Sequence, residues 1–409
     1  MSMDLRICYL IPRLPLGESG VLVGCTASNC VSLVRWMRRR NISVEIISPM
    51  LEENVEFLDG SSLADFIRPI PIQQRGVIGN GLASLKKLRK SVKERMQKSI
   101  YNVVHSHSGT YPYALAVLAA NRRKCVRLHS LYCPLGAKGG LLGGLWEQSF
   151  MARSVLNRLD TVIAVSSNVS KSIKAAGIVS EKIEQIPICV DRERFYPRKP
   201  GGPRRFFPAE AKGAKILFVG NASIQKGLFE LLEALHILNK KKVPFFFVGT
   251  IENESKIKEY TTRYKTAEKI IHNLGLDKRV RLLGLVDSIE DIYAESDIVV
   301  IPWNTSHGPS DYPLSALEGM AMEKCIVSTP VGGCPDLLKN NKYGVLADSF
   351  SPASIAAALE RAITEPLLQQ KVARAALEMS NVFSLEKTAT KLINIYTDLL
   401  ERRGNTIEK

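Results

Sequence analysis

Short apolar segments alternate with amphipathic segments along most of the chain. In the first half this pattern predicts strands over residues 5–11, 43–49, 101–105, 125–128 and 161–165. Apolar residues at helical spacing predict helices over residues 27–40, 111–121 and 168–177. Strands that alternate with helices build parallel sheets, so the first half is predicted to be an α/β domain.

The alternation is interrupted at residues 197–213, where the segment PRKPGGPRRFFPAEAKG contains four prolines. It then resumes, with strands expected over residues 215–220, 244–249, 279–283, 298–302 and 325–329. Helices are expected over residues 227–238, 289–295 and 314–322, and along the C-terminus. We therefore expect an α/β protein of two Rossmann-like doubly wound domains facing a cleft, over residues 1–199 and 200–383, with ligands at the carboxyl ends of the strands.

Composition agrees with a globular protein of more than one domain. The 409 residues are 45% hydrophobic and 23% charged, and no apolar run approaches the roughly 18 residues of a spanning helix. Eight cysteines occur singly, with no C-x-x-C pair, which argues against a zinc site or a disulfide framework. The first residues do not resemble a secretory leader. We expect a cytoplasmic protein with no metal and no cofactor.

The net charge of +16 is unevenly distributed. Residues 1–199 carry 29 Lys and Arg against 15 Asp and Glu, whereas residues 200–409 carry 27 against 25. Such asymmetry indicates that the first half meets something anionic, although a solvated surface explains the same charges. Nucleic acid is the least favoured partner, because no basic segment is interleaved with the aromatic residues that stack on bases.

Residues suited to binding phosphate follow two strands of the second half. The strand KILFVG ends at Gly220, and Asn221 leads through a polar loop to Lys226 at a helix start. A glycine lets the backbone approach a ligand there, and the lysine neutralises phosphate.

After the strand at residues 298–302, a loop leads to Tyr312, Pro313 and Leu314, where a helix start offers unpaired N–H groups. Glu318, one turn further along, is suited to accept hydrogen bonds from the two ribose hydroxyls. The alternative for Glu318 is an acid that only complements the helix dipole.

Seven segments occur in the order found in glycosyltransferase family 4. They are VVHSHSG, TVIAVSSNVSKSI, IPICVDRERFYP, ILFVGNASIQKGLFELLEAL, VRLLGLVDSIEDIYAESDIVVIP, YPLSALEGMAMEKCIVSTPVGGCPDLL and KYGVL. From about residue 103 onward the chain resembles these retaining enzymes, which have the two-domain GT-B architecture. The resemblance implies sugar transfer from a nucleotide-diphosphate sugar held by the C-terminal domain. It also implies that the last helix, about residues 384–409, packs back on the N-terminal domain.

The resemblance assigns a role to each matching residue. Lys226 would contact the donor diphosphate, Glu318 the ribose, and the backbone at residues 312–314 the phosphates. The loop with Gly20 and Gly24 would close on the donor. His107, in VVHSHSG, would lie on the acceptor side, whereas His105 would pack internally. His129 also ends a strand and is a second acceptor-side candidate, with a structural role as the alternative.

Two positions depart from the family pattern. Asn221 stands where the family usually has Arg, and this removes one positive charge from the diphosphate site. Ser310, followed by Asp311, stands where the family has the first of two paired glutamates, the one that contacts the transferred sugar. These departures leave open a nucleotide-sugar-binding protein with little turnover. An epimerase on the same fold is a further alternative, made less favourable by only six histidines.

The chain contains no D-x-D pair to anchor Mg²⁺, so we expect metal-independent chemistry. Fixed donors, Lys226 among them, would stabilise the leaving diphosphate, and His107 would orient the acceptor.

Residues 84–100, SLKKLRKSVKERMQKSI, contain seven Lys or Arg and one apolar stripe at helical spacing. This pattern predicts a surface helix docked on its own domain. Its basic face suggests peripheral contact with an anionic membrane, which would suit a lipid-linked acceptor.

Overall fold

Parallel strands alternate with helices through both halves of the chain. The structure, a computed structural model, describes residues 4–14, 24–58, 61–72, 77–98, 101–136, 150–198, 205–251, 258–305 and 310–407. By its internal contacts the chain divides into unit 1, residues 1–188 and 385–409, and unit 2, residues 189–384. No helix of the described residues is both long enough and apolar enough to cross a membrane.

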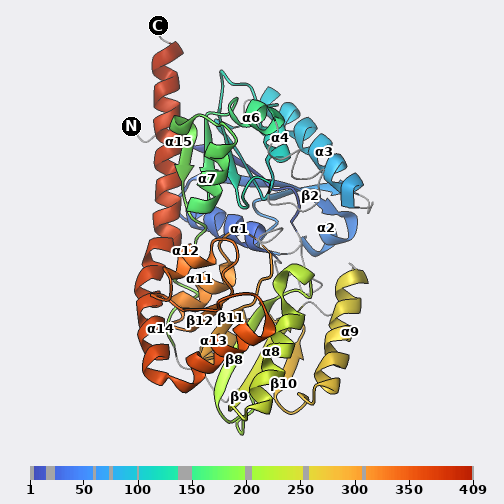
Figure 1. The fold of residues 1–409 in the computed structure, drawn as a ribbon. Coiled ribbons are helices and arrows are strands. Elements are labelled where there is room, and N and C mark those ends of the chain that lie inside the picture. The colour runs from blue at the N-terminus through green and yellow to red at the C-terminus, as the bar shows by residue number, and fades with distance from the viewer. Residues whose placement is uncertain are drawn as a thin grey trace. The chain divides into compact units, whose positions relative to one another are not determined.

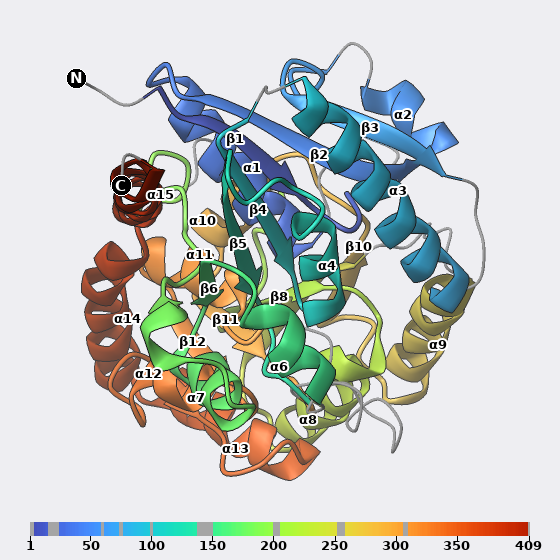
Figure 2. The same cartoon turned by 90° about the horizontal axis from the view of Figure 1, so that it is seen from above.

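Unit 1 is a seven-stranded parallel sheet in the order β3-β2-β1-β4-β5-β6-β7. Its strands are β1 (Arg6–Leu10), β2 (Ser43–Leu51), β3 (Ile67–Ile72), β4 (Val103–Ser108), β5 (Val126–Leu131), β6 (Thr161–Ala164) and β7 (Ile183–Gln185). Its helices are α1 (Cys25–Arg38), α2 (Glu52–Leu58), α3 (Val77–Gln97), α4 (Ala114–Val117), α6 (Phe150–Leu156), α7 (Ser167–Ala175) and α15 (Leu385–Ile407). Helices α1 and α15 pack together on one face, and α3 and α4 pack together on the other (Figure 2).

Unit 2 is a six-stranded parallel sheet in the order β10-β9-β8-β11-β12-β13. Its strands are β8 (Ala214–Gly220), β9 (Phe245–Ile251), β10 (Val280–Leu283), β11 (Ile298–Ile301), β12 (Cys325–Ser328) and β13 (Val345–Leu346). Its helices are α8 (Leu228–Lys240), α9 (Lys258–Asn273), α10 (Ile289–Glu295), α11 (Leu314–Ala321), α12 (Cys334–Leu338), α13 (Pro352–Thr364) and α14 (Pro366–Ser380) (Figure 1). In both units the strand order reverses beside the first strand, as in a doubly wound sheet. The predicted class of two Rossmann-like α/β domains is confirmed.

Some predicted elements differ from those observed. The segment expected as one helix over residues 111–121 forms a 3₁₀ turn, Tyr111–Tyr113, and the short helix α4. The Asn121 side chain accepts a hydrogen bond from the Arg123 amide at 2.9 Å, and this turn ends the segment. Strand β3 was not predicted because its sequence, IRPIPI, contains two prolines, which a strand tolerates only at a sheet edge.

The described part of the proline-rich segment is packed onto unit 2. The Glu295 carboxylate accepts hydrogen bonds from the amides of Arg205, Phe206 and Phe207 at 2.8 to 3.1 Å, and Phe207 is buried. The units therefore divide between Ile188 and Cys189, whereas the proline content had placed the boundary after residue 199.

Candidate functional site

The carboxyl ends of β8 and β11 meet around Gly227. This glycine has a φ of 67°, in the left-handed region, and caps the start of α8. A Cβ atom at this position would collide with the carbonyl oxygen of Pro302, which directly follows β11. Only glycine therefore allows the loop that carries Lys226 to lie against the end of β11.

The Lys226 side chain lies beside an aromatic ring from the neighbouring strand end. Its Nζ atom is 4.5 Å from the centroid of the Trp303 ring, and Trp303 is buried. The Asn304 side-chain amide donates a hydrogen bond to the carbonyl oxygen of Ile224 at 2.8 Å and so ties the two loops together. A cation over the face of an indole ring is attracted by the ring quadrupole, so Trp303 helps to place the charge of Lys226.

The segment that leads into α11 is held by the loop after β12. Gly333 donates its backbone N–H to the Asp311 carbonyl oxygen at 3.2 Å, and the Tyr312 hydroxyl donates to Asp336 Oδ2 at 2.8 Å. Pro313 precedes α11, and no side chain caps this helix. The N–H groups of its first residues, Leu314 and Ser315, have no acceptor within the helix.

Cys334 directly follows the loop after β12, which contacts both of these parts of the site. Its thiol is buried, and burial raises its pKa to about 12. This pKa is the net result of burial, of a hydrogen bond with Ser328 that lowers it, and of the charges of Asp311, which raises it, and Lys226, which lowers it. The Thr329 hydroxyl donates a hydrogen bond to the carbonyl oxygen of Trp303 at 2.5 Å, and the Gly333 amide donates one to Asp311, so the loop after β12 contacts both parts of the site.

Glu318 lies in the second turn of α11 rather than the first. Tyr293 of α10 donates a hydrogen bond to Glu318 Oε2 at 2.9 Å. Burial raises the pKa of the Glu318 carboxyl to about 7, although Tyr293 and Arg194 both oppose this shift. Arg194 also forms an ion pair with Glu290 at 2.7 Å. The reading of Glu318 as a first-turn acid is wrong, because Glu318 begins the second turn of α11 and its carboxylate accepts a hydrogen bond from the buried Tyr293.

The two positions that depart from the family pattern have different environments. The Asn221 side chain accepts a hydrogen bond from the Ser223 amide at 3.2 Å, so its oxygen shapes the turn after Gly220. The Ser310 hydroxyl is buried and has no hydrogen-bond partner among the described residues. A buried polar group without a partner requires an explanation, and a bound ligand is one.

In unit 1, His105 and His107 lie on the same face of β4, with ring centroids 4.0 Å apart. Both nitrogens of His105 are satisfied, by the Tyr396 hydroxyl at 2.7 Å and the Ser130 hydroxyl at 2.8 Å. His107 Nδ1 lies 3.3 Å from the Tyr132 hydroxyl, whereas His107 Nε2 is buried and has no partner in the described part of the chain. His105 thus has an internal role, and His107 keeps one unused polar atom.

His129 lies on the opposite face of the sheet from His107, because it is paired in register with Ser106 rather than with His107. Its Nδ1 atom contacts the Ser106 hydroxyl at 2.7 Å. Burial lowers the pKa of His129 to about 3, an effect that the backbone of Thr110 partly opposes. The two proposed acceptor-side histidines therefore lie on adjacent strands but on opposite faces of the sheet.

The first glycine-rich loop is described only in part. Gly24 caps α1 with a φ of 102°, a conformation that favours glycine. Gly20 lies outside the described residues.

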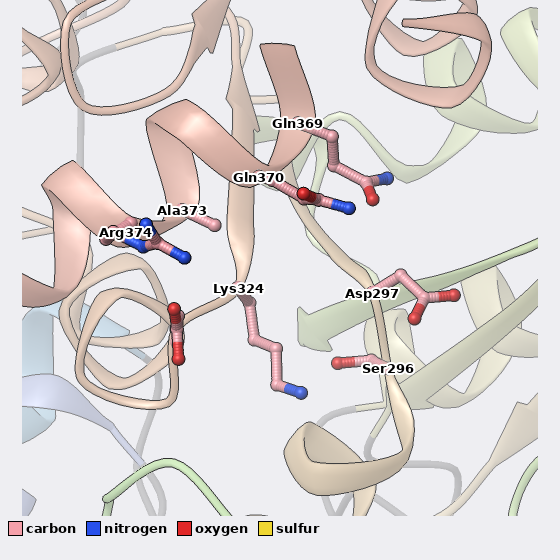
Figure 3. Close-up of a pocket in the computed structure, with 8 residues that line it drawn as sticks. Ser296, Asp297, Lys324, Gln369, Gln370, Ala373 and Arg374 are labelled. Atoms are coloured by element: carbon pink, nitrogen blue, oxygen red, sulfur yellow. The ribbon is translucent and has the colours of Figure 1, made fainter. Parts of the chain in front are cut away.

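A surface pocket of about 260 Å³ lies at the other edge of the unit 2 sheet. Ser296 and Asp297 precede β11, Lys324 precedes β12, and the rest of the lining comes from Glu323 and from Gln369, Gln370, Ala373 and Arg374 of α14 (Figure 3). Parallel α/β sheets bind ligands at the carboxyl ends of their strands, so this pocket is not the predicted donor site.

Sequence reasoning missed Trp303, Tyr293 and Arg194. Trp303 directly follows a predicted strand end and could have been noticed for that reason. The sequence carries no signal for the other two, because Tyr293 binds Glu318 from α10 and Arg194 lies in the segment before β8, where it pairs with Glu290.

The sequence matches two family models of glycosyltransferases. Residues 27–194 match the family model Glycosyltransferase Family 4, and residues 204–379 match the model Glycosyl transferases group 1. An uncharacterized glycosyltransferase of Methanocaldococcus jannaschii is 24% identical, over 76% of this chain and 80% of that protein. The D-inositol 3-phosphate glycosyltransferase of Saccharomonospora viridis is 23% identical, over 91% of this chain and 89% of that protein.

Solved structures share the fold over nearly the whole chain. Sucrose-phosphate synthase from Thermosynechococcus elongatus has a TM-score of 0.76 and 18% identity, covering 97% of this chain and 100% of its own. Anabaena HepE in complex with UDP-glucose has a TM-score of 0.72 and 16% identity, covering 96% and 100%. With both family models matched and this fold present, the chain belongs to the GT-B glycosyltransferases of family 4 and group 1 and is a glycosyltransferase.

Proposed function

We propose that this glycosyltransferase moves a sugar from a nucleoside-diphosphate sugar to an acceptor hydroxyl with retention at the anomeric carbon. The observation that carries the proposal is that the loop after β12 contacts both Trp303, which lies beside Lys226, and the segment that leads into the uncapped start of α11. A fixed cation and free helix N–H groups bind diphosphate oxygens. The HepE structure with UDP-glucose supports the same class of donor.

In the proposed reaction, the bond between the anomeric carbon and the diphosphate oxygen breaks as the acceptor oxygen attacks from the same face. The acceptor's proton passes to a phosphate oxygen, and the electron pair of the broken bond stays on the diphosphate. Lys226 and the N–H groups of Leu314 and Ser315 stabilise the negative charge that develops there. Glu318 accepts hydrogen bonds from the ribose hydroxyls. His107 orients the acceptor, and no metal ion takes part.

For the acceptor we propose an anionic molecule. Unit 1 contains most of the basic first half of the sequence, where Lys and Arg outnumber Asp and Glu by 29 to 15 over residues 1–199. The name of the relative from Saccharomonospora viridis, D-inositol 3-phosphate glycosyltransferase, denotes an acceptor that is itself anionic.

Helix α3 supports peripheral contact with anionic lipid. Leu88, Val92 and Met96 are buried, so its apolar stripe is already used for packing. The opposite face carries exposed cations, namely Lys86, Lys87, Arg89, Lys90 and Lys93. Any attraction to a membrane would therefore be electrostatic, with about 1 kcal/mol for each cation near the surface.

A thermal-shift screen with UDP-, GDP-, ADP- and TDP-sugars tests the donor proposal. A ligand at about 100 times its dissociation constant stabilises the folded protein by about 2.7 kcal/mol, which raises Tm measurably. The active donor is then incubated with phosphorylated and neutral acceptors, and the product is identified by mass spectrometry and its anomeric configuration by NMR. Binding without product would favour the nucleotide-sugar-binding alternative, which the changes at Asn221 and Ser310 suggest.

A further inference from the structure

A series of buried hydrogen bonds connects α1 to His107. The Asn29 side-chain amide donates to the Tyr132 hydroxyl at 2.8 Å, and that hydroxyl lies 3.3 Å from His107 Nδ1. The Cys30 thiol lies 3.8 Å from the same hydroxyl. Asn29, Tyr132 and His107 are at most 4% exposed, so water does not compete for these contacts.

The number of available protons determines which atom donates and which accepts in each of these hydrogen bonds. Burial raises the pKa of the Tyr132 hydroxyl well above its usual value, so Tyr132 keeps its single proton. Burial also raises the pKa of the Cys30 thiol, which therefore keeps its hydrogen and can donate it. The Tyr132 oxygen thus accepts a hydrogen bond from Asn29 and has one hydrogen to donate. It donates this hydrogen to His107 Nδ1 rather than to the Cys30 sulfur, because an imidazole nitrogen is a better acceptor than a thiol.

We propose that Asn29 and Tyr132 are positioning residues that hold neutral His107 with its proton on Nε2, so that His107 donates a hydrogen bond from Nε2 to an oxygen of the acceptor. The proposal deepens the acceptor-orienting role given to His107 above and rests on it. A histidine that must donate from Nε2 cannot use the same atom as a general base. It therefore acts by orientation rather than by removing a proton.

Two observations support this assignment. His107 Nε2 is buried without a partner among the described residues, whereas both nitrogens of the adjacent His105 are satisfied. In addition, burial and the nearby His129 lower the pKa of His107 to about 3, so the ring is neutral at physiological pH. A group with so low a pKa is a weak base at neutral pH.

The tautomer can be observed directly in the full chain labelled with ¹⁵N-histidine. Long-range ¹H–¹⁵N spectra distinguish a protonated ring nitrogen from an unprotonated one, and we expect an unprotonated Nδ1 and a protonated Nε2 for His107. In Tyr132→Phe, the His107 signals should shift toward a mixture of tautomers. The matched control is Tyr396→Phe, which removes the hydroxyl beside His105 Nδ1 and should change the protonation of the His105 ring nitrogens while His107 keeps its proton on Nε2. A wild-type His107 protonated on Nδ1 would overturn the proposal, whatever the activity of the protein.

Turnover provides a second, independent measurement. In His107→Gln the side-chain amide nitrogen takes the position of Nε2, and in His107→Asn it takes the position of Nδ1. We expect His107→Gln to keep kcat/KM within about tenfold of wild type, and His107→Asn and His107→Ala to lose about 100-fold, the usual effect of removing one fixed donor. Equal losses in the Gln and Ala variants contradict a donor role. If wild type turns over no nucleotide sugar, the proposed function fails, while the tautomer measurement still decides the inference.

Discussion

The Nζ atom of Lys226 lies 4.5 Å from the centroid of the Trp303 ring, and the two residues follow neighbouring strands of the unit 2 sheet. Asn221, at the position where the family resemblance predicts an arginine, carries no charge, and its side-chain oxygen is occupied in a turn. The proposed diphosphate site therefore depends strongly on the position of one ammonium group. An indole ring beside that group restricts the rotamers of a flexible side chain and leaves its charge available.

We predict that Lys226→Ala lowers kcat/KM by about 100-fold or more, because a fixed cation that stabilises the leaving diphosphate is lost. The loss should be mainly in kcat, and the circular dichroism spectrum should not change. Lys241→Ala is the matched control, since Lys241 lies on the surface in an ion pair with Glu360 and should have no effect on turnover. A folded Lys226→Ala variant with wild-type kcat/KM excludes Lys226 from the mechanism.

Glu318→Gln should weaken nucleotide binding by about tenfold, because the amide replaces an acceptor oxygen with a donor at the ribose. Isothermal titration with the nucleoside diphosphate measures this. The ionised carboxylate is disfavoured by burial, so the substitution should leave Tm at pH 8 unchanged or slightly higher. Glu233→Gln, at an exposed position of α8, is a suitable control. Unchanged affinity in Glu318→Gln would leave Glu318 with a structural role only.

Activity should persist in EDTA, because the chain has no D-x-D pair and the negative charge is assigned to Lys226 and backbone N–H groups. The assay compares initial rates with EDTA, with Mg²⁺ and with neither. Loss of activity in EDTA and its recovery with Mg²⁺ would show that a metal ion stabilises part of the negative charge assigned to Lys226.

The stability of unit 1 should fall as the pH drops below about 6.5. Burial lowers the pKa of His105, His107 and His129, so in this range the unfolded chain binds protons that the folded unit does not. Between pH 7 and 5 each histidine can cost up to about 2 kcal/mol. Stability at neutral pH is therefore lost on acidification and is not lost as the pH rises.

Hydrogen exchange of peptides from β4 and β5 measures the pH dependence of the stability of unit 1 separately from that of unit 2. The separation matters because Glu318 of unit 2, with a pKa raised to about 7, acts in the opposite sense between its usual 4.5 and 7. His129→Asn should reduce the pH dependence of unit 1, and His272→Asn, at an exposed position, should not. Equal protection at pH 7 and 5 contradicts the neutral, buried state of the cluster.

Anionic vesicles should bind the protein in a salt-sensitive manner through α3. Changing Lys86, Lys87, Arg89 and Lys90 to Gln removes four exposed cations, each contributing about 1 kcal/mol near such a surface. The control removes four exposed cations from unit 2, Lys240, Lys241, Lys265 and Lys269. Sedimentation with neutral and anionic vesicles is the measurement. Equal binding to both kinds of vesicle, or to neither, means that the basic face of α3 is only solvated.

Part of the proposed donor site could be predicted from the sequence, because its residues follow strands. Lys226 comes directly before a helix, and residues 310–314 lead into another, so local pattern alone placed both at the carboxyl edge of a parallel sheet. The environment of Glu318 could not be predicted from the sequence. Tyr293 donates a hydrogen bond to Glu318 from α10, and the charge of Arg194 acts on it from the segment before β8. Periodicity carries no information about which side chains meet in space.

The sequence by itself determined the alternation of strands and helices, the existence of two α/β domains and the strand ends that carry Lys226 and His107. Those features depend on local spacing of apolar residues and on glycines, which act over a few positions. Only the tertiary structure decided which polar atoms are paired. Tyr396 satisfies His105 from 291 positions away, and Tyr132 satisfies one nitrogen of His107 and leaves the other unused. Such pairings arise when folding removes water from buried polar groups, so they follow from the packing of α1 and α15 on the sheet rather than from any local pattern.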